Sequence, residues 1–195
     1  AAIYEWNNLI RDHADDAYFA AAWDEKSWTQ WSKLGNYDLA AQTLFDFVAL
    51  YPTRSEAPQY LFFAARIQED NNKIVESAAT FERIINEYPS SSLAYRALFL
   101  AGINYYRSGA YTQALQAFQR IFVLGANAAD QAMGSFWVAK TQQKLNDAAA
   151  ANESFSQAAA LDPGSYYSER AREILAGLEP LESMEPYSLE YDLAT

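Results

Sequence analysis

The feature that most constrains the fold is a spacing of 37 residues that recurs along the chain. Residue types that tolerate a left-handed backbone recur at this spacing, at Gly35, Asn72, Gly109 and Asn146. A column of large apolar side chains follows them at Leu44, Phe81, Phe118 and Phe155, and proline closes three units at Pro52, Pro89 and Pro163. A fixed period of this length indicates stacked copies of one supersecondary unit.

Residues 93–124 show what the unit is. Apolar residues share one helical face on each side of a break at Gly109: Leu98, Ala101, Gly102 and Tyr105 before it, and Ala114, Phe118, Ile121 and Leu124 after it. Gly109 can adopt a left-handed conformation, end the first helix and let the chain double back. Two helices with their apolar stripes on the same side cannot close a core, so the hairpin needs neighbours. We therefore expect an all-α solenoid of helical hairpins.

The period also divides the chain. We expect residues 1–22 to be the end of a truncated preceding repeat, whose apolar stripe contains Ile3, Trp6 and Ile10. Residues 23–178 should form four hairpins and a terminal helix that Ser165 caps and Gly177 ends. Residues 179–195 have two prolines, several acids and no period, so we interpret them as a linker or tail. The start without Met suggests a processed or excised piece.

Composition excludes several classes of function. A net charge of -11 and a pI near 4.5 argue against binding of nucleic acid, which depends on Lys and Arg meeting phosphates. No run approaches the roughly 18 to 20 apolar residues of a transmembrane helix. The chain has no Cys and one His, His13, so thiolate and two-histidine metal sites are impossible. We expect no metal and no cofactor.

The hairpins resemble the tetratricopeptide repeat (TPR). The small residues of its first helix correspond to Ala65, Gly102 and Ala139, and the alanine that opens its second helix corresponds to Ala40, Ala114 and Ala151. Trp28 and Ser77 depart from these patterns. The resemblance implies a right-handed superhelical solenoid that binds a protein or peptide partner. Turns such as Tyr88-Pro89 look like the variant common in bacterial envelope proteins, which implies an extracytoplasmic location.

Residues 135–178 also resemble the helical region that precedes the catalytic domain of soluble lytic transglycosylases. The likeness rests on Phe136-Trp137, the turn Asp162-Pro163-Gly164, and Tyr166-Tyr167 followed by Arg170 and Arg172. It implies a parent protein that cleaves peptidoglycan glycan strands, with this chain as its noncatalytic scaffold. The alternative is a stand-alone adaptor that binds a protein partner in the bacterial envelope.

The catalytic motif of that family is a Glu-Ser dipeptide, and the chain contains two, Glu153-Ser154 and Glu182-Ser183. Neither precedes the glycine-rich stretch of the family's catalytic domain. A single carboxylate acts as general acid only in a cleft that raises its pKa, which a solenoid helix face does not supply. We interpret both as surface residues and predict no catalytic residue in this chain.

The resemblance to TPR stacks implies a concave groove lined by the first helix of each unit. Transferring the family's positions one by one gives Phe62, Arg66, Phe99, Ile103, Tyr106, Phe136, Lys140 and Gln143, and Arg96, Arg107 and Lys144 flank them. All of these except Ile103 form the candidate ligand-binding set. Its basic and aromatic side chains favour an extended ligand with carboxylates, such as an acidic peptide or a peptidoglycan stem peptide. The alternative is that these residues are ordinary solvated faces and contacts between units.

Overall fold

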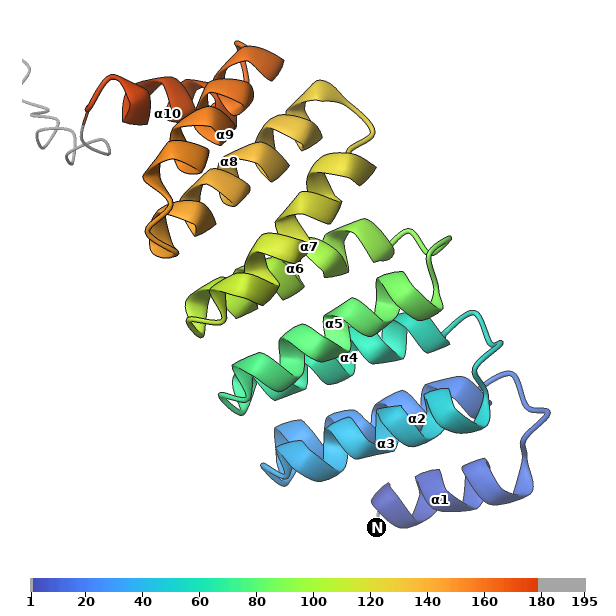
Figure 1. Cartoon of the computed structure of the whole chain (residues 1–195). Coiled ribbons are helices and arrows are strands. Elements are labelled where there is room, and N and C mark those ends of the chain that lie inside the picture. Colours follow the sequence, from blue (N-terminus) through green and yellow to red (C-terminus); the bar gives the residue numbers. More distant parts are fainter. Residues whose placement is uncertain (1, 179–195) are drawn as a thin grey trace, which may run out of the picture.

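The computed structural model describes residues 2–178. Within this range the chain is all-α, without a strand, and its helices pair into hairpins that stack side by side (Figure 1). The elements are α1 (Ala2–Asp12), α2 (Phe19–Trp28), the π-helix η1 (Thr29–Lys33), α3 (Tyr37–Leu50), α4 (Ala57–Asp70), α5 (Ile74–Glu87), α6 (Ala94–Arg107), α7 (Tyr111–Leu124), α8 (Ala128–Lys144), α9 (Ala148–Leu161) and α10 (Tyr166–Leu175). The all-α, TPR-like solenoid is confirmed.

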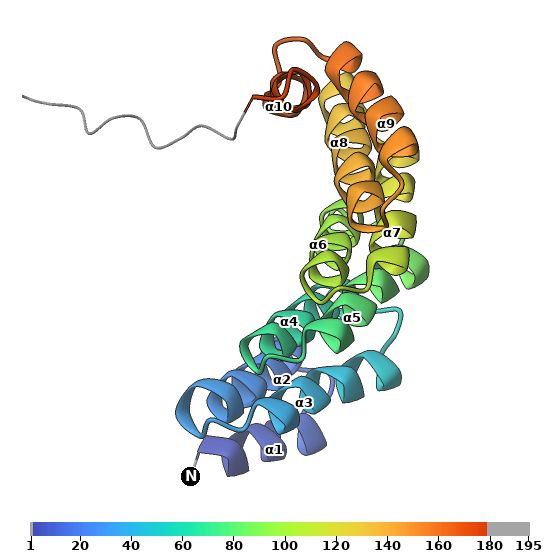
Figure 2. The same cartoon turned by 60° about the vertical axis from the view of Figure 1, so that its left-hand side comes forward.

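The stack is curved, and the two helices of each hairpin lie on different sides of the arc. Figure 2 shows α4, α6 and α8 along the inner side and α5, α7 and α9 along the outer side. At the C-terminal end, α10 folds back beside α8 on the inner side. We call the inner side, formed by α2, η1, α4, α6 and α8, the inner face.

The repeated break residues make the hairpin turns. Gly35, Asn72, Gly109 and Asn146 all have positive φ, at 62°, 57°, 82° and 61°. In each hairpin the second helix begins two residues later, and the side chains of Asn36 and Asp147 cap two of them by accepting hydrogen bonds from Leu39 and Ala150 N–H. The left-handed positions predicted from the period are confirmed.

Gly109→Ala should lower the free energy of unfolding by about 1 kcal/mol, because a Cβ at positive φ meets the following carbonyl. No other atom lies within 4 Å of a Cβ built there, so the backbone conformation alone sets the cost. Gly109→Asn, the residue type at the equivalent positions 72 and 146, should cost less. Urea denaturation of the two variants tests this order, and equal losses would contradict it.

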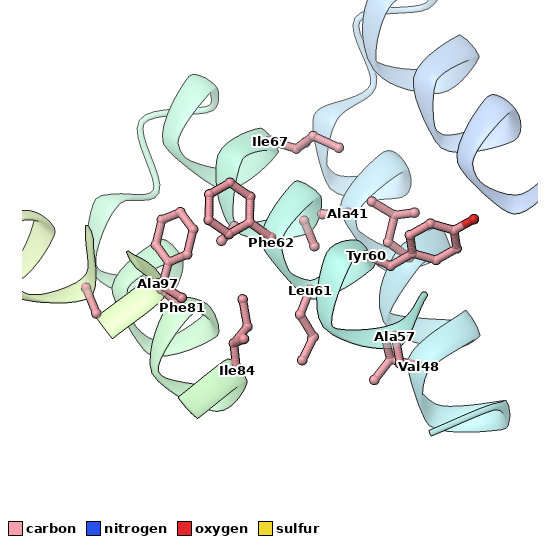
Figure 3. Close-up of a cluster of buried hydrophobic side chains, with 14 of the residues drawn as sticks. Ala41, Val48, Ala57, Tyr60, Leu61, Phe62, Ile67, Phe81, Ile84 and Ala97 are labelled. Atoms are coloured by element: carbon pink, nitrogen blue, oxygen red, sulfur yellow. The ribbon is translucent and has the colours of Figure 1, made fainter. Parts of the chain in front are cut away.

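The predicted apolar columns form the core. Leu44, Phe81, Phe118 and Phe155 are buried, as are Phe47, Ile84, Ile121 and Ala158 one turn further along. Figure 3 shows Phe62 and Phe81 facing each other between α4 and α5, where their ring centroids are 5.1 Å apart. One cluster of buried apolar residues extends from Phe19 to Val138, and two smaller clusters lie around Phe155 and Ile121, so most units share a core with their neighbours.

The first hairpin differs from its predicted form. Its first helix begins at Phe19, because the turn at residues 13–18 ends there and the Phe19 ring is buried against Trp23 and Tyr51. The π-helical turn η1 then adds one residue to the helix. Ser27, which is 1% exposed, takes the small interior position, and Trp28 is 43% exposed. Trp28 is therefore not a packing defect in the first unit.

The second departure, Ser77, is accommodated by a hydrogen bond. Ser77 is fully buried at the start of α5, and its Oγ accepts from Asn104 Nδ2 of the next unit at 3.1 Å. The same amide donates to Glu69 Oε1 at 2.7 Å. The serine therefore joins α5 to α6 through a polar contact where the other units use a methyl group.

Candidate functional site

The inner face contains the predicted ligand-binding residues, but two of the aromatic ones have little surface to offer. Phe62 and Phe136 are 8% and 7% exposed and pack inside their hairpins, Phe136 against Phe155 at 5.7 Å. Phe99 is half-buried and packs against both Phe118 and Trp137. These phenylalanines pack beneath the surface of the inner face. A bound ligand would therefore contact mainly the more exposed side chains beside them.

The accessible aromatic wall lies further along the stack, where α6 meets α8. Tyr106 is half-buried and contacts the Trp137 ring edge-to-face at 5.5 Å, and Tyr111 at 5.6 Å. Ile103, one turn before it, is also half-buried. Burial raises the pKa of Tyr106, so its hydroxyl stays protonated and can donate a hydrogen bond. From the sequence, Trp137 was used only in the likeness of Phe136-Trp137 to the lytic transglycosylase region and was not predicted as a ligand-binding residue.

Two of the three predicted basic residues on α4 and α6 are already engaged. Arg66 forms an ion pair with Glu69, whose other oxygen accepts from Asn104. The guanidinium of Arg96 lies over the Phe62 ring, 5.4 Å from its centroid. Arg107 is exposed at the end of α6. Arg66 is therefore paired within α4, and its partner Glu69 makes the contact with the next unit.

Two lysines of α8 and an arginine of α10 lie close together at the C-terminal end of the inner face. Lys140 is half-buried on α8, and its pKa is lowered by burial first, and then by the nearby charges of Lys144 and Arg170. No acidic side chain of residues 2–178 forms an ion pair with either lysine, and Arg170 of α10 pairs with Glu173. We call Lys140, Lys144 and Arg170 the basic corner. Gln143 is exposed on the adjacent turn.

A cavity of about 290 Å³ opens at the other end of the inner face, between α2, η1 and α4. We call it the indole cavity, and its lining residues are Asp24, Ser27, Trp28, Trp31, Leu44, Phe63, Arg66 and Ile67. Only Arg66 of these was predicted as a site residue. The signal that could have located the cavity is Trp28, a large residue at a position where the repeat requires a small one.

A larger hollow, of about 690 Å³, lies on the outer side between α5 and α7. Its lining is Ile85, Pro89, Gln116, Gln119, Arg120, Val123 and Leu124. Arg120 is its one charged group, and that side chain already donates to Asn86 Oδ1 at 2.9 Å. The lining offers apolar area without groups for catalysis or metal binding.

The residues considered for catalysis occupy ordinary positions. Glu153 is exposed on α9, while Ser154 is buried and donates to Gln142 Oε1 at 2.8 Å. Glu182-Ser183 lies outside the described residues, and His13 is exposed in the turn after α1. Within residues 2–178 no group of three His, Cys, Asp or Glu side chains could hold a metal ion. Nor is any helix in this range long and apolar enough to span a membrane.

Comparison with known proteins agrees with the geometry of the hairpins. The family model of the tetratricopeptide repeat matches residues 61–91 and 96–122, which lie in the α4–α5 and α6–α7 hairpins. No curated protein matches the chain. Two of the hairpins are thus similar to the tetratricopeptide repeat, and the chain as described is an all-α, TPR-like solenoid.

Proposed function

We propose that the chain is a noncatalytic binding module that holds an extended peptide with carboxylate groups along its inner face. The observation that carries this proposal is the basic corner, where the like charges of Lys140 and Lys144 of α8 and Arg170 of α10 repel one another and neither lysine has an ion-pair partner among residues 2–178. A bound carboxylate would remove that repulsion and form charge-assisted hydrogen bonds with the ammonium and guanidinium groups. The chain carries a net charge of -11, so a ligand with carboxylates is repelled by most of the surface and is favoured where cations gather.

The aromatic wall supplies the second part of the binding surface. Trp137 lies one helical turn before Lys140, and Tyr106 packs against it at 5.5 Å. A peptide that places a carboxylate at the basic corner can therefore lay an apolar side chain against these rings. Gln143 adds an exposed amide that can donate to or accept from the peptide backbone.

Charge reversal at the corner should weaken binding of an acidic peptide by about tenfold to a hundredfold, since charge-assisted hydrogen bonds contribute about 1.5–3 kcal/mol. The variant is Lys140→Glu with Lys144→Glu, and the probe is an acidic peptide with a free C-terminal carboxylate, measured by isothermal titration calorimetry. Affinity for the wild type should also fall with added salt.

A matched control changes the same number of charges at the other end of the stack. Lys26→Glu with Lys33→Glu lies on α2 and η1, and its effect on the same titration should stay within about twofold. Unchanged affinity of the corner variant, with its circular dichroism spectrum intact, would overturn the proposal. Equal losses in both variants would also overturn it, because they would reveal a response to net charge alone.

A narrower proposal names the ligand and the parent protein. The sequence likeness of residues 135–178 to the region before a lytic transglycosylase domain favours peptidoglycan stem peptides as the source of carboxylates, in the bacterial envelope. In support, α8 and α9 form a hairpin, and Tyr167 of α10 packs on Phe136 at 5.5 Å. The alternative is an adaptor for an acidic protein segment. Stronger binding of muropeptides than of acidic peptides, and a reading frame that continues into a Glu-Ser domain, would favour the first.

A further inference from the structure

The indole cavity is shaped by the irregularity in the first hairpin. Because η1 adds a residue, Ser27 lies on the floor, its hydroxyl donating to the Ala40 carbonyl at 2.9 Å, and Trp28 is displaced to the rim. Trp31 and Phe63 complete an aromatic lining from η1 and α4. A volume of about 290 Å³ is at the lower limit for small-molecule sites, so the cavity suits a single chemical group.

Asp24 gives this aromatic cavity a negative charge. Its carboxylate is partly buried, and among residues 2–178 no basic side chain forms an ion pair with it. Burial raises the pKa of Asp24, and the neighbouring charge of Glu25 raises it further. The cation in the lining, Arg66, is already neutralised by its ion pair with Glu69. The negative charge of Asp24 therefore has no counter-charge among the residues that line the cavity.

The ring of Trp28 is accessible to an ammonium group. Lys33 Nζ lies 4.7 Å from its centroid, which is a cation–π distance. Lys33 itself is exposed and is not part of the cavity lining, so this contact leaves the charge of Asp24 uncompensated. Aromatic faces together with a carboxylate are the chemistry that proteins use to bind alkylammonium groups.

We propose that the indole cavity binds an alkylammonium group, either a lysine side chain of a partner or a small quaternary amine. The group would lie against Trp28, Trp31 and Phe63 with its charge opposite Asp24. A neutral apolar group would fill the same volume but would bury the carboxylate further without a counter-charge, which is costly. This site is at the opposite end of the inner face from the basic corner and does not depend on an acidic ligand there.

The test is a titration of the full chain followed by the indole N–H signals in nuclear magnetic resonance spectra. The probe is choline, and the comparison is its neutral carbon isostere, 3,3-dimethylbutan-1-ol. Choline should shift the Trp28 and Trp31 signals saturably, and the isostere should bind about tenfold or more weakly. Equal affinity for both compounds, or no saturable shift with choline, would overturn the proposal. Lysine amide and its trimethylated form then distinguish the two sources of the group.

Two substitutions assign the effect to the cavity. Asp24→Asn should weaken choline binding about tenfold, and Trp28→Ala should weaken it at least as much. Asp46→Asn is the matched control, because it removes one charge from an exposed site on α3 and should leave the affinity unchanged. An affinity that Asp24→Asn does not alter would overturn the role of the carboxylate and with it the proposal.

The same variant separates a binding role from a structural one. Because the folded-state pKa of Asp24 is raised above the ordinary value of 3.8, its contribution to stability falls as pH rises through that pKa. Asp24→Asn should therefore raise the melting temperature at pH 7 relative to Asp46→Asn, and this gain should vanish below pH 3.8. A carboxylate that lowers the stability of the fold but binds a cation is typical of a functional site, where stability is lost in exchange for binding. A lower melting temperature at pH 7 would indicate a structural role and contradict the proposal.

Discussion

Phe118→Ala is expected to lower the free energy of unfolding by about 3–5 kcal/mol, the usual cost of emptying a fully buried phenylalanine site. Phe118 has no exposed surface and joins three helices: its ring packs against Phe99 of α6 at 6.1 Å and stacks on Trp137 of α8 at 5.4 Å. The loss would therefore weaken two interfaces at once. Urea denaturation followed by circular dichroism measures it.

The control is Val123→Ala on the same helix. Val123 is 76% exposed, so its truncation should change the free energy of unfolding by less than about 0.5 kcal/mol. In a stack of repeats, weakening one interface can also uncouple the two ends. We expect fluorescence of Trp137 to change at a lower urea concentration than the circular dichroism signal. A loss under 1 kcal/mol for Phe118→Ala would contradict this account of the core.

A double-mutant cycle tests why the small residue opposite Phe118 is required. A Cβ on Gly102 would lie 2.6 Å from Cε1 of the Phe118 ring, so Gly102→Ala overfills the contact between α6 and α7. Phe118→Leu shortens the side chain that causes the clash. The loss in the double variant should therefore be smaller than the sum of the two single losses. Additive losses would mean that the two positions do not share this contact.

The fold was predictable because its determinants are local and repeated. A positive φ at Asn72 or Asn146 follows from the break in each hairpin, and burial of Phe81 and Phe155 follows from the periodic apolar face. The π-helical turn η1 was not predictable, because one added residue hardly alters a short apolar pattern. Because this added residue was not foreseen, the repeat pattern predicted Trp28 at the small interior position, whereas Trp28 is exposed.

Polar contacts in the interior were also missed. Thr43 donates to Gln30, Thr80 to Gln68 and Ser154 to Gln142, at 2.7–2.8 Å. These pairs recur at equivalent places in three hairpins and join the first helix to the second. A single sequence does not distinguish such threonines and glutamines from surface residues, because their hydrogen-bond partners are known only once the helices are paired.

The sequence predicted which helices carry the candidate site residues but not what surrounds those residues. The positions transferred from the repeat include Lys140 and Gln143, with Lys144 beside them, and all three residues are on α8. The third cation of the basic corner, Arg170, joins them only because α10 folds back beside α8, and a non-repeating terminal helix has no family position to transfer. We predicted Phe62 and Phe136 as ligand-binding residues, but their side chains are buried inside their hairpins.

Gly134→Ala is expected to lower the free energy of unfolding by about 3 kcal/mol, at the upper end of the range for overpacking. A Cβ on this residue would lie 2.6 Å from the backbone nitrogen of Phe122 and 2.7 Å from its Cα. Backbone atoms within α7 cannot rotate away as a side chain can, so α7 and α8 would have to separate. The control is Gly164→Ala, whose Cβ meets no atom within 4 Å and which should be close to neutral in urea denaturation.

The same variant tests whether the inner face acts as one surface. α8 bears Trp137, Lys140 and Lys144, while Tyr106 is on α6. Moving α8 away from α7 would therefore separate Tyr106 from Trp137 and from the basic corner without changing any of these residues. At a temperature where Gly134→Ala remains folded, we expect affinity for the acidic peptide to fall several-fold. If the affinity is unchanged while stability falls, the peptide contacts only α8 and α10, and the binding surface ends at that hairpin.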